Sequence, residues 1–198
     1  MSKLQILIFG TNQYYESPPE IFANFTKTHN VENFNQKREN SMSFGYHLTS
    51  SDPTEIKLYF LKNYEKSYPI CHDSDAYIIF IDLECVDALD KLNSIISYIK
   101  EECSTDIKSF VIGKYNNIED KIKSLNYQTM NSHLKNKNFI FEYSEICTEP
   151  KKEFDYIIEK TLKQILENKF RMKKNKQLEQ LLDEEITDAD SNSGCMIY

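Results

Sequence analysis

The stretch LQILIFGTNQYYESPPEIF, residues 4–22, decides the fold of this chain. Its first seven residues, 4–10, form a short apolar run that predicts a buried strand. Ser17 then offers an N-cap, Pro18 suits the first helical position, and Glu20 completes a capping box three residues after the serine. The stretch therefore predicts a strand, a turn and a helix in immediate succession.

The rest of the chain continues the alternation of strands and helices. Apolar spacing predicts later helices at 86–99, 117–135 and 154–166, and apolar or alternating runs predict further strands at 43–48, 55–61, 76–82, 107–113 and 138–144. The turn sequence SSDPT makes the first two of these strands a hairpin, whereas 76–82 is apolar throughout, which is typical of a central strand. Residues 30–41 are polar and predict a loop.

This order predicts an α/β fold with a mostly parallel six-stranded sheet, one antiparallel edge strand and helices on both faces. In such sheets ligands bind at the carboxyl ends of the strands. We therefore expect the loops that follow residues 10, 61, 113 and 144 to share one rim of the sheet.

Composition and charge narrow the classes of function. The net charge of −7 argues against a nucleic-acid partner, which requires a basic face. No apolar run reaches the length of a membrane span, no signal peptide is visible, and Ser2 excludes N-myristoylation. The five cysteines form no CxxC pair and the four histidines lack ligand spacing, so we expect a reducing cytoplasm and no metal site.

The C-terminal part changes character after about residue 170. Residues 169–176 are basic, residues 179–190 are acidic, and the chain ends in Cys195-Met196-Ile197-Tyr198. We expect a folded domain over 1–170 and a frayed helix end with a flexible tail over 171–198. The last four residues fit a CaaX box, which predicts prenylation of Cys195; a free thiol is the alternative.

The order of elements, together with the cysteine tail, resembles the Ras superfamily of small GTPases, and its Rab branch in particular. In that family the first turn reads G-x-x-x-x-G-K-[ST] and wraps phosphates. Gly10 and Ser17 match, but Tyr15 and Glu16 replace the second glycine and the lysine. A unit charge at ~4 Å is worth ~4 kcal/mol at an effective dielectric of 20, so Glu16 exchanges an attraction for a repulsion of similar size.

The family's other nucleotide motifs are altered as well. The resemblance places Lys114 and Asn116 in the guanine-reading motif and Ser144 in the last base-contacting motif. Asn116 replaces the carboxylate that accepts two hydrogen bonds from guanine. The metal-binding threonine has Ser41 as its nearest counterpart, and the Asp-x-x-Gly-Gln motif is replaced by residues 61–66, LKNYEK, so no catalytic residue is expected.

These observations predict an atypical Rab-like or Ras-like protein that acts in membrane trafficking or signalling as a lipidated binding module. GTP binding and hydrolysis would be weak or lost, no cofactor is expected, and protein effectors or trafficking regulators would be its partners. The protein would be cytoplasmic and reversibly membrane-associated. One alternative is a divergent but active GTPase that binds GTP or GDP with Mg²⁺; another is an unrelated α/β domain with an incidental tail cysteine.

Overall fold

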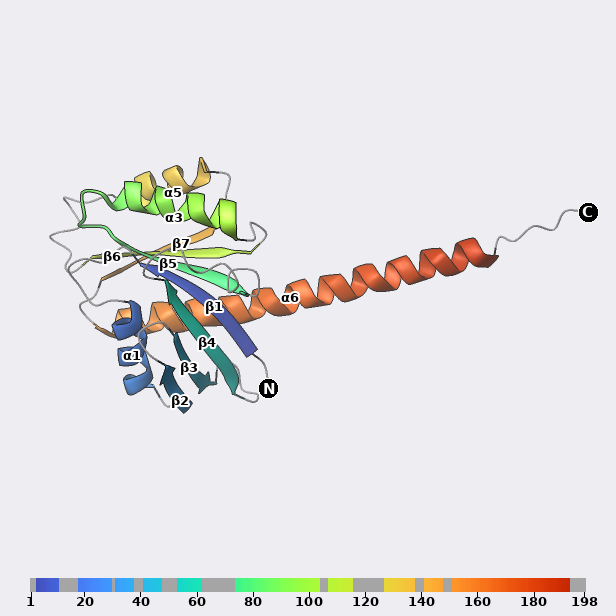
Figure 1. Ribbon diagram of the computed structural model, residues 1–198, viewed down its shortest axis with the longest axis horizontal. Helices are drawn as coiled ribbons and strands as arrows, with labels where there is room; N and C mark the ends of the chain where they lie inside the picture. Colours follow the sequence, from blue (N-terminus) through green and yellow to red (C-terminus); the bar gives the residue numbers. More distant parts are fainter. Residues whose placement is uncertain are drawn as a thin grey trace, which may run out of the picture.

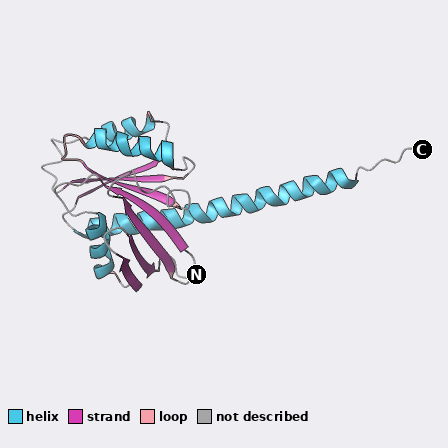
Figure 2. Cartoon of the chain, viewed as in Figure 1, coloured by secondary structure: helices cyan, strands magenta, loops and turns pink. Residues whose placement is uncertain are grey.

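The structure is a computed structural model, and it describes residues 3–10, 18–29, 31–37, 41–47, 53–61, 74–103, 107–115, 127–137, 141–147 and 151–192. Within the last range it describes the side chains of 155–175, 177 and 178. A mostly parallel sheet lies between two layers of helices, and one long helix extends away from this body (Figure 1; Figure 2). The predicted α/β class is confirmed.

The sheet has seven strands in the order β2-β3-β4-β1-β5-β6-β7. Their bounds are β1 (Lys3–Gly10), β2 (Glu32–Lys37), β3 (Ser41–Tyr46), β4 (Thr54–Leu61), β5 (Ala76–Asp82), β6 (Ser109–Tyr115) and β7 (Phe141–Cys147). β3 runs antiparallel to both neighbours, and all pairs from β4 to β7 are parallel. The predicted hairpin is thus the β3–β4 pair.

The prediction of six strands was wrong, because residues 32–37 form the additional strand β2 at the sheet edge. As a result the antiparallel strand β3 lies second from the edge and not at it. The sequence ENFNQK lacks the apolar alternation that marks a half-buried strand. Its pairing with β3 shifts register between Glu32 and Asn35, where Asn33 adopts a positive φ of 51°. A polar, irregular edge strand leaves little periodic signal.

Four described helices cover the sheet: α1 (Pro18–Thr28), α3 (Ala88–Glu102), α5 (Tyr127–Lys135) and α6 (Lys151–Asn192). α1 and α6 pack on one face, where the core includes Phe22, Phe25 and Leu162. α3 and α5 pack on the other face with Leu92 and Met130. β5 is buried along its whole length, as expected of a strand covered on both faces.

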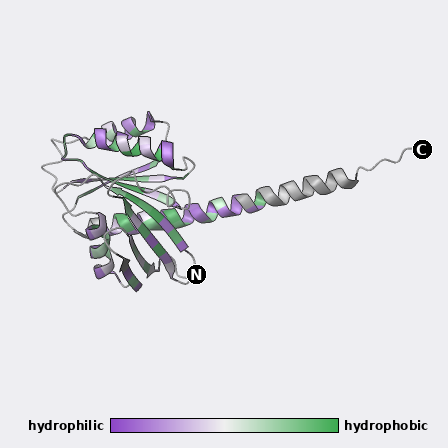
Figure 3. Cartoon of the chain, viewed as in Figure 1, coloured by the Kyte–Doolittle hydropathy of each residue, from purple (hydrophilic) through white to green (hydrophobic). Residues whose placement is uncertain are grey.

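The final helix continues much further than expected. α6 is 42 residues long and ends at Asn192, whereas the sequence led us to expect fraying from residue 171. The part of α6 that lies against the sheet carries its core residues and is largely hydrophobic (Figure 3). The sequence does carry a helical signal in this region, because Leu178, Leu181, Leu182 and Ile186 recur at spacings of three and four residues, and the prediction overlooked it.

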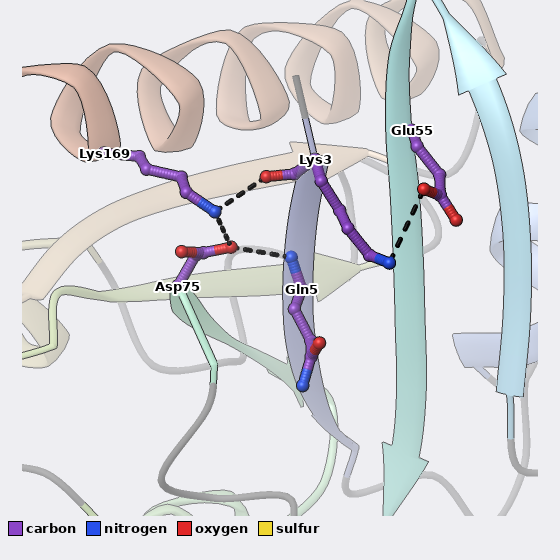
Figure 4. Close-up of polar contacts among 5 residues, drawn as sticks. All are labelled: Lys3, Gln5, Glu55, Asp75 and Lys169. Atoms are coloured by element: carbon purple, nitrogen blue, oxygen red, sulfur yellow. Dashed lines mark hydrogen bonds and ion pairs between the residues drawn. The ribbon is translucent and has the colours of Figure 1, made fainter. Parts of the chain in front are cut away.

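A cluster of polar contacts fastens α6 to the amino end of the sheet (Figure 4). The Lys169 ammonium donates to Asp75 Oδ2 at 2.8 Å and to the Lys3 carbonyl at 2.7 Å. Asp75 Oδ2 also accepts from the Gln5 backbone N–H at 2.8 Å. Lys3 in turn pairs with Glu55 at 3.6 Å. One helical side chain therefore links α6 to β1 and to the residue that precedes β5.

Candidate functional site

The carboxyl ends of five parallel strands meet at one rim of the sheet, as the sequence led us to expect. Phe9 is level with Leu61, Gly10 with Phe80, Asp82 with Lys114, and Tyr115 with Cys147. In open α/β sheets this rim is where ligands bind. It is therefore the candidate functional site, and the described residues around it show what it can hold.

Gly10, the residue that matches the first glycine of a phosphate loop, is packed against the start of α1. A Cβ at this position would lie 2.5 Å from Pro18 Cγ and 3.1 Å from Pro18 Cδ. The proline ring is rigid and cannot move aside cheaply. The close approach of strand and helix therefore requires glycine here whether or not a phosphate binds.

The first turn of α1 has few backbone donors to offer an anion. A helix N-terminus binds phosphate through the free N–H groups of its first turn. α1 begins with Pro18 and Pro19, neither of which has an N–H, followed by Glu20. The Glu20 carboxylate also places a negative charge beside the positive end of the helix dipole. This end of the helix is thus less suited to phosphate than a first turn with all its donors.

Lys114 is buried within the sheet and does not lie in a loop after it. It belongs to β6, is 2% exposed, and is level with Asp82 of β5, which is 1% exposed. The Leu83 N–H donates to the Lys114 carbonyl at 2.9 Å, which extends the pairing past the end of β5. Because the two residues are level on adjacent parallel strands, their side chains point to the same face of the sheet.

Asp82 also organises the turn that follows β5. Its Oδ1 accepts from the Glu84 N–H at 3.0 Å, and its carbonyl accepts from the Cys85 N–H at 3.3 Å. Burial raises the pKa of the Cys85 thiol, with a further contribution from the nearby Asp82 carboxylate. Cys85 is therefore held in its neutral form, which is unsuited to nucleophilic chemistry.

On the opposite face of the sheet, the Tyr143 side chain extends from the middle of β7 toward the rim. The Tyr143 hydroxyl donates to Glu145 Oε1 at 2.8 Å, and the Tyr143 ring lies 5.2 Å from that of Tyr127. Burial, followed by the Glu145 charge, raises the pKa of Tyr143. A Cβ on Gly113 would lie 2.8 Å from the Tyr143 hydroxyl oxygen and 2.9 Å from Leu83 Cδ1. A side chain at position 113 would therefore require the ends of the Tyr143 and Leu83 side chains to shift.

The structure corrects two expected site positions. The strands predicted at 107–113 and 138–144 occur at 109–115 and 141–147. Ser144 therefore lies in the middle of β7, level with Ile112, and not at its carboxyl end. Lys114 lies inside β6 and not after it. The alternating pattern continues beyond both predicted ends, and sequence periodicity does not fix where a strand stops.

Of the other predicted positions, Ser41 begins β3 and lies level with Tyr59, close to the rim. Ser17, Asn116 and Cys195 lie outside the described residues, as do Tyr15 and Glu16. The structure brings Gly10 and Lys114 to the rim and places Ser144 away from it. Sequence reasoning missed Asp82, although a carboxylate that ends an otherwise apolar run was a visible signal.

Two further findings concern the described part of the chain. It contains no group of three or more histidine, cysteine, aspartate or glutamate side chains arranged to hold a metal ion. None of its helices combines the length and apolar character that a membrane crossing requires. Compared with known proteins, the sequence matches no protein-family model and no curated protein.

Proposed function

We propose that this protein is an atypical, Ras-superfamily-like protein, Rab-like in its tail, which works as a lipidated binding module in membrane trafficking or signalling. Its rim would bind GTP weakly or not at all. The protein would present fixed surfaces to effectors or trafficking regulators, and the hairpin β3–β4 is the first such surface to consider. Support comes from the residues at the rim and from the sequence of the tail.

The start of α1 is the observation that carries the proposal. Pro18 and Pro19 remove two of the first-turn N–H groups. A hydrogen bond to a charged group is worth roughly 1.5–3 kcal/mol, so two missing donors correspond to about 3–6 kcal/mol. That range amounts to about two to four powers of ten in affinity. Glu16 in place of a lysine would weaken phosphate binding further.

The packing at Gly113 supports the loss of guanine recognition. The resemblance places the asparagine of the guanine-reading motif at this position. Tyr143 and Leu83 fill the space where the asparagine side chain would begin. An asparagine at position 113 would therefore need these two side chains to move before it could read a base.

The alternative function is a divergent but active GTP-dependent switch. The retained Lys114, buried at the rim beside Asp82, favours it. Thermal unfolding of the purified protein in about 1 mM GTP with Mg²⁺ distinguishes the two functions, because a nanomolar ligand at that concentration would stabilise the fold by about 8 kcal/mol. We expect the Tm in GTP with Mg²⁺ to be no higher than the Tm in the same concentration of ATP with Mg²⁺. A nucleotide-specific, Mg²⁺-dependent rise would support the switch and contradict the proposal.

The lipidated tail has a separate test. Incubation with a protein geranylgeranyltransferase and geranylgeranyl diphosphate should add one lipid to the protein, detected by mass spectrometry, and Cys195→Ser should abolish it. Cys85→Ser is the matched control and should be modified normally. The product should cosediment reversibly with vesicles, because one lipid chain gives only marginal membrane binding. An unmodified Cys195 thiol under these conditions would contradict this part of the proposal.

A further inference from the structure

The outer part of α6 projects beyond the body of the molecule (Figure 1). Leu166 is the last residue of α6 in the core, and Lys169 makes its last described polar contacts with the sheet. Every described side chain from Phe170 onward is exposed. At 1.5 Å per residue, residues 170–192 form about 35 Å of helix.

This projecting helix exposes apolar side chains and extends beyond the core that stabilises the rest of α6. Three of its apolar side chains are about half exposed: Phe170 at 52%, Met172 at 47% and Leu178 at 49%. Most helical stability in proteins comes from the packing of an apolar face, and the described side chains of this part are exposed. Contact with a partner surface would bury these apolar side chains and stabilise the projecting part of α6.

The charges of the projecting helix are divided into two blocks of opposite sign. The basic block of the projecting part, 170–176, contains Arg171, Lys173, Lys174 and Lys176. The acidic block, 179–190, contains Glu179, Asp183, Glu184, Glu185, Asp188 and Asp190. Leu178 lies between the blocks. A uniformly anionic surface, such as a membrane rich in phosphatidylserine, would attract the first block and repel the second.

We propose that the partner is a second copy of this chain, bound through an antiparallel pairing of the two projecting helices. In that arrangement each basic block faces the acidic block of the other copy, whereas parallel pairing would place like charges together. The pairing is self-complementary and closes as a two-fold dimer. Leu178 falls near its centre, where the exposed apolar surface of both helices can be buried.

Charge reversal on the full-length protein tests this inference. Sedimentation equilibrium of the wild type should show a monomer–dimer equilibrium that weakens as salt rises. Lys173→Glu with Lys174→Glu should weaken self-association at least tenfold, and so should Asp183→Lys with Glu184→Lys. Mixing these two variants should restore association, now between unlike chains, because one helix is then acidic and the other basic.

Lys27→Glu with Lys135→Glu is the matched control for Lys173→Glu with Lys174→Glu, since both lysines are exposed on the body and the net charge changes by the same amount. This variant should dimerise like the wild type, and far-UV circular dichroism should confirm that all variants are folded. A wild type that stays monomeric at high concentration and low salt overturns the inference. So does a mixture of reversed variants that fails to associate. Binding of a monomer to phosphatidylserine vesicles, lost in Lys173→Glu with Lys174→Glu, would assign the helix to lipid instead.

Discussion

At the scale of single residues, Gly10 shows how one amino acid satisfies two explanations. In the sequence it matches the first glycine of a phosphate loop. In the structure it permits Pro18 to pack directly on the end of β1. The packing explanation requires no ligand, so Gly10 by itself is not evidence for a nucleotide.

Gly10→Ala should destabilise the protein by about 1–3 kcal/mol, the usual range for overpacking, because its Cβ would meet the Pro18 ring. The measurement is urea unfolding. The same substitution in a Pro18→Ala background should cost less than half as much, since the atoms that collide are then absent. An equal cost in both backgrounds would show that Pro18 is not the reason for the glycine.

Glu142 gives the protein a pH-dependent contribution to stability. Burial raises the pKa of its carboxyl group, but hydrogen bonds from Lys108 at 2.7 Å and Gln164 at 2.6 Å outweigh burial and lower the pKa below its ordinary 4.5. A group whose pKa is lower in the folded state stabilises above its unfolded pKa and loses this effect as the pH falls through the folded value.

The free energy of unfolding of the wild type should therefore exceed that of Glu142→Gln by a constant amount from pH 7 to about 5. The difference should shrink as the pH falls below about 4. Urea unfolding across this range provides the measurement, with Glu167→Gln on the exposed surface of α6 as the control. A difference that stays constant down to pH 3 would contradict the assigned contacts.

At the scale of secondary-structure elements, the Lys169 contacts determine where α6 stops packing on the sheet. Asp75 is only 17% exposed on its side chain, so removal of the lysine leaves a largely buried carboxylate with fewer partners. Lys169→Met should cost about 1–2 kcal/mol of stability and increase amide exchange in the adjoining turns of α6.

Lys163→Met is the matched control for Lys169→Met. Lys163 lies on the same helix, and its ion pair within the described part of the chain is an i,i+4 pair with Glu159 at 2.6 Å. Such pairs are worth about 0.3–0.5 kcal/mol. If both substitutions cost the same, the contacts with Asp75 and Lys3 do not fasten the helix.

The sequence predicted most elements because their apolar faces are periodic. β5 is continuously apolar, and α3 repeats its buried residues at helical spacing. β2 was missed because it is a polar edge strand, held in place by backbone pairing with β3 and not by an apolar face. The ends of β6 and β7 were misplaced by two to three residues, which moved Lys114 into the sheet and Ser144 away from the rim.

At the scale of the whole molecule, the sequence predicted the arrangement of strands and helices better than it predicted which side chains meet at the rim. Parallel strands with crossover helices require a common carboxyl rim, and alternation in the sequence was enough to locate it. What the rim contains depends on tertiary packing: Pro18 over Gly10, Tyr143 and Leu83 beside Gly113, and Lys114 level with Asp82. In each of these contacts the two partners are separated by eight or more residues in the sequence. A local sequence pattern therefore does not reveal that they touch.

The central claim is that the rim of the sheet binds GTP weakly or not at all. The most direct test is to purify the full-length protein without added nucleotide, denature it, and measure guanine nucleotides in the supernatant by chromatography. A small GTPase of ordinary affinity, prepared in parallel, is the control. We predict far less than one nucleotide per chain, and one equivalent of GDP or GTP per chain would contradict the claim.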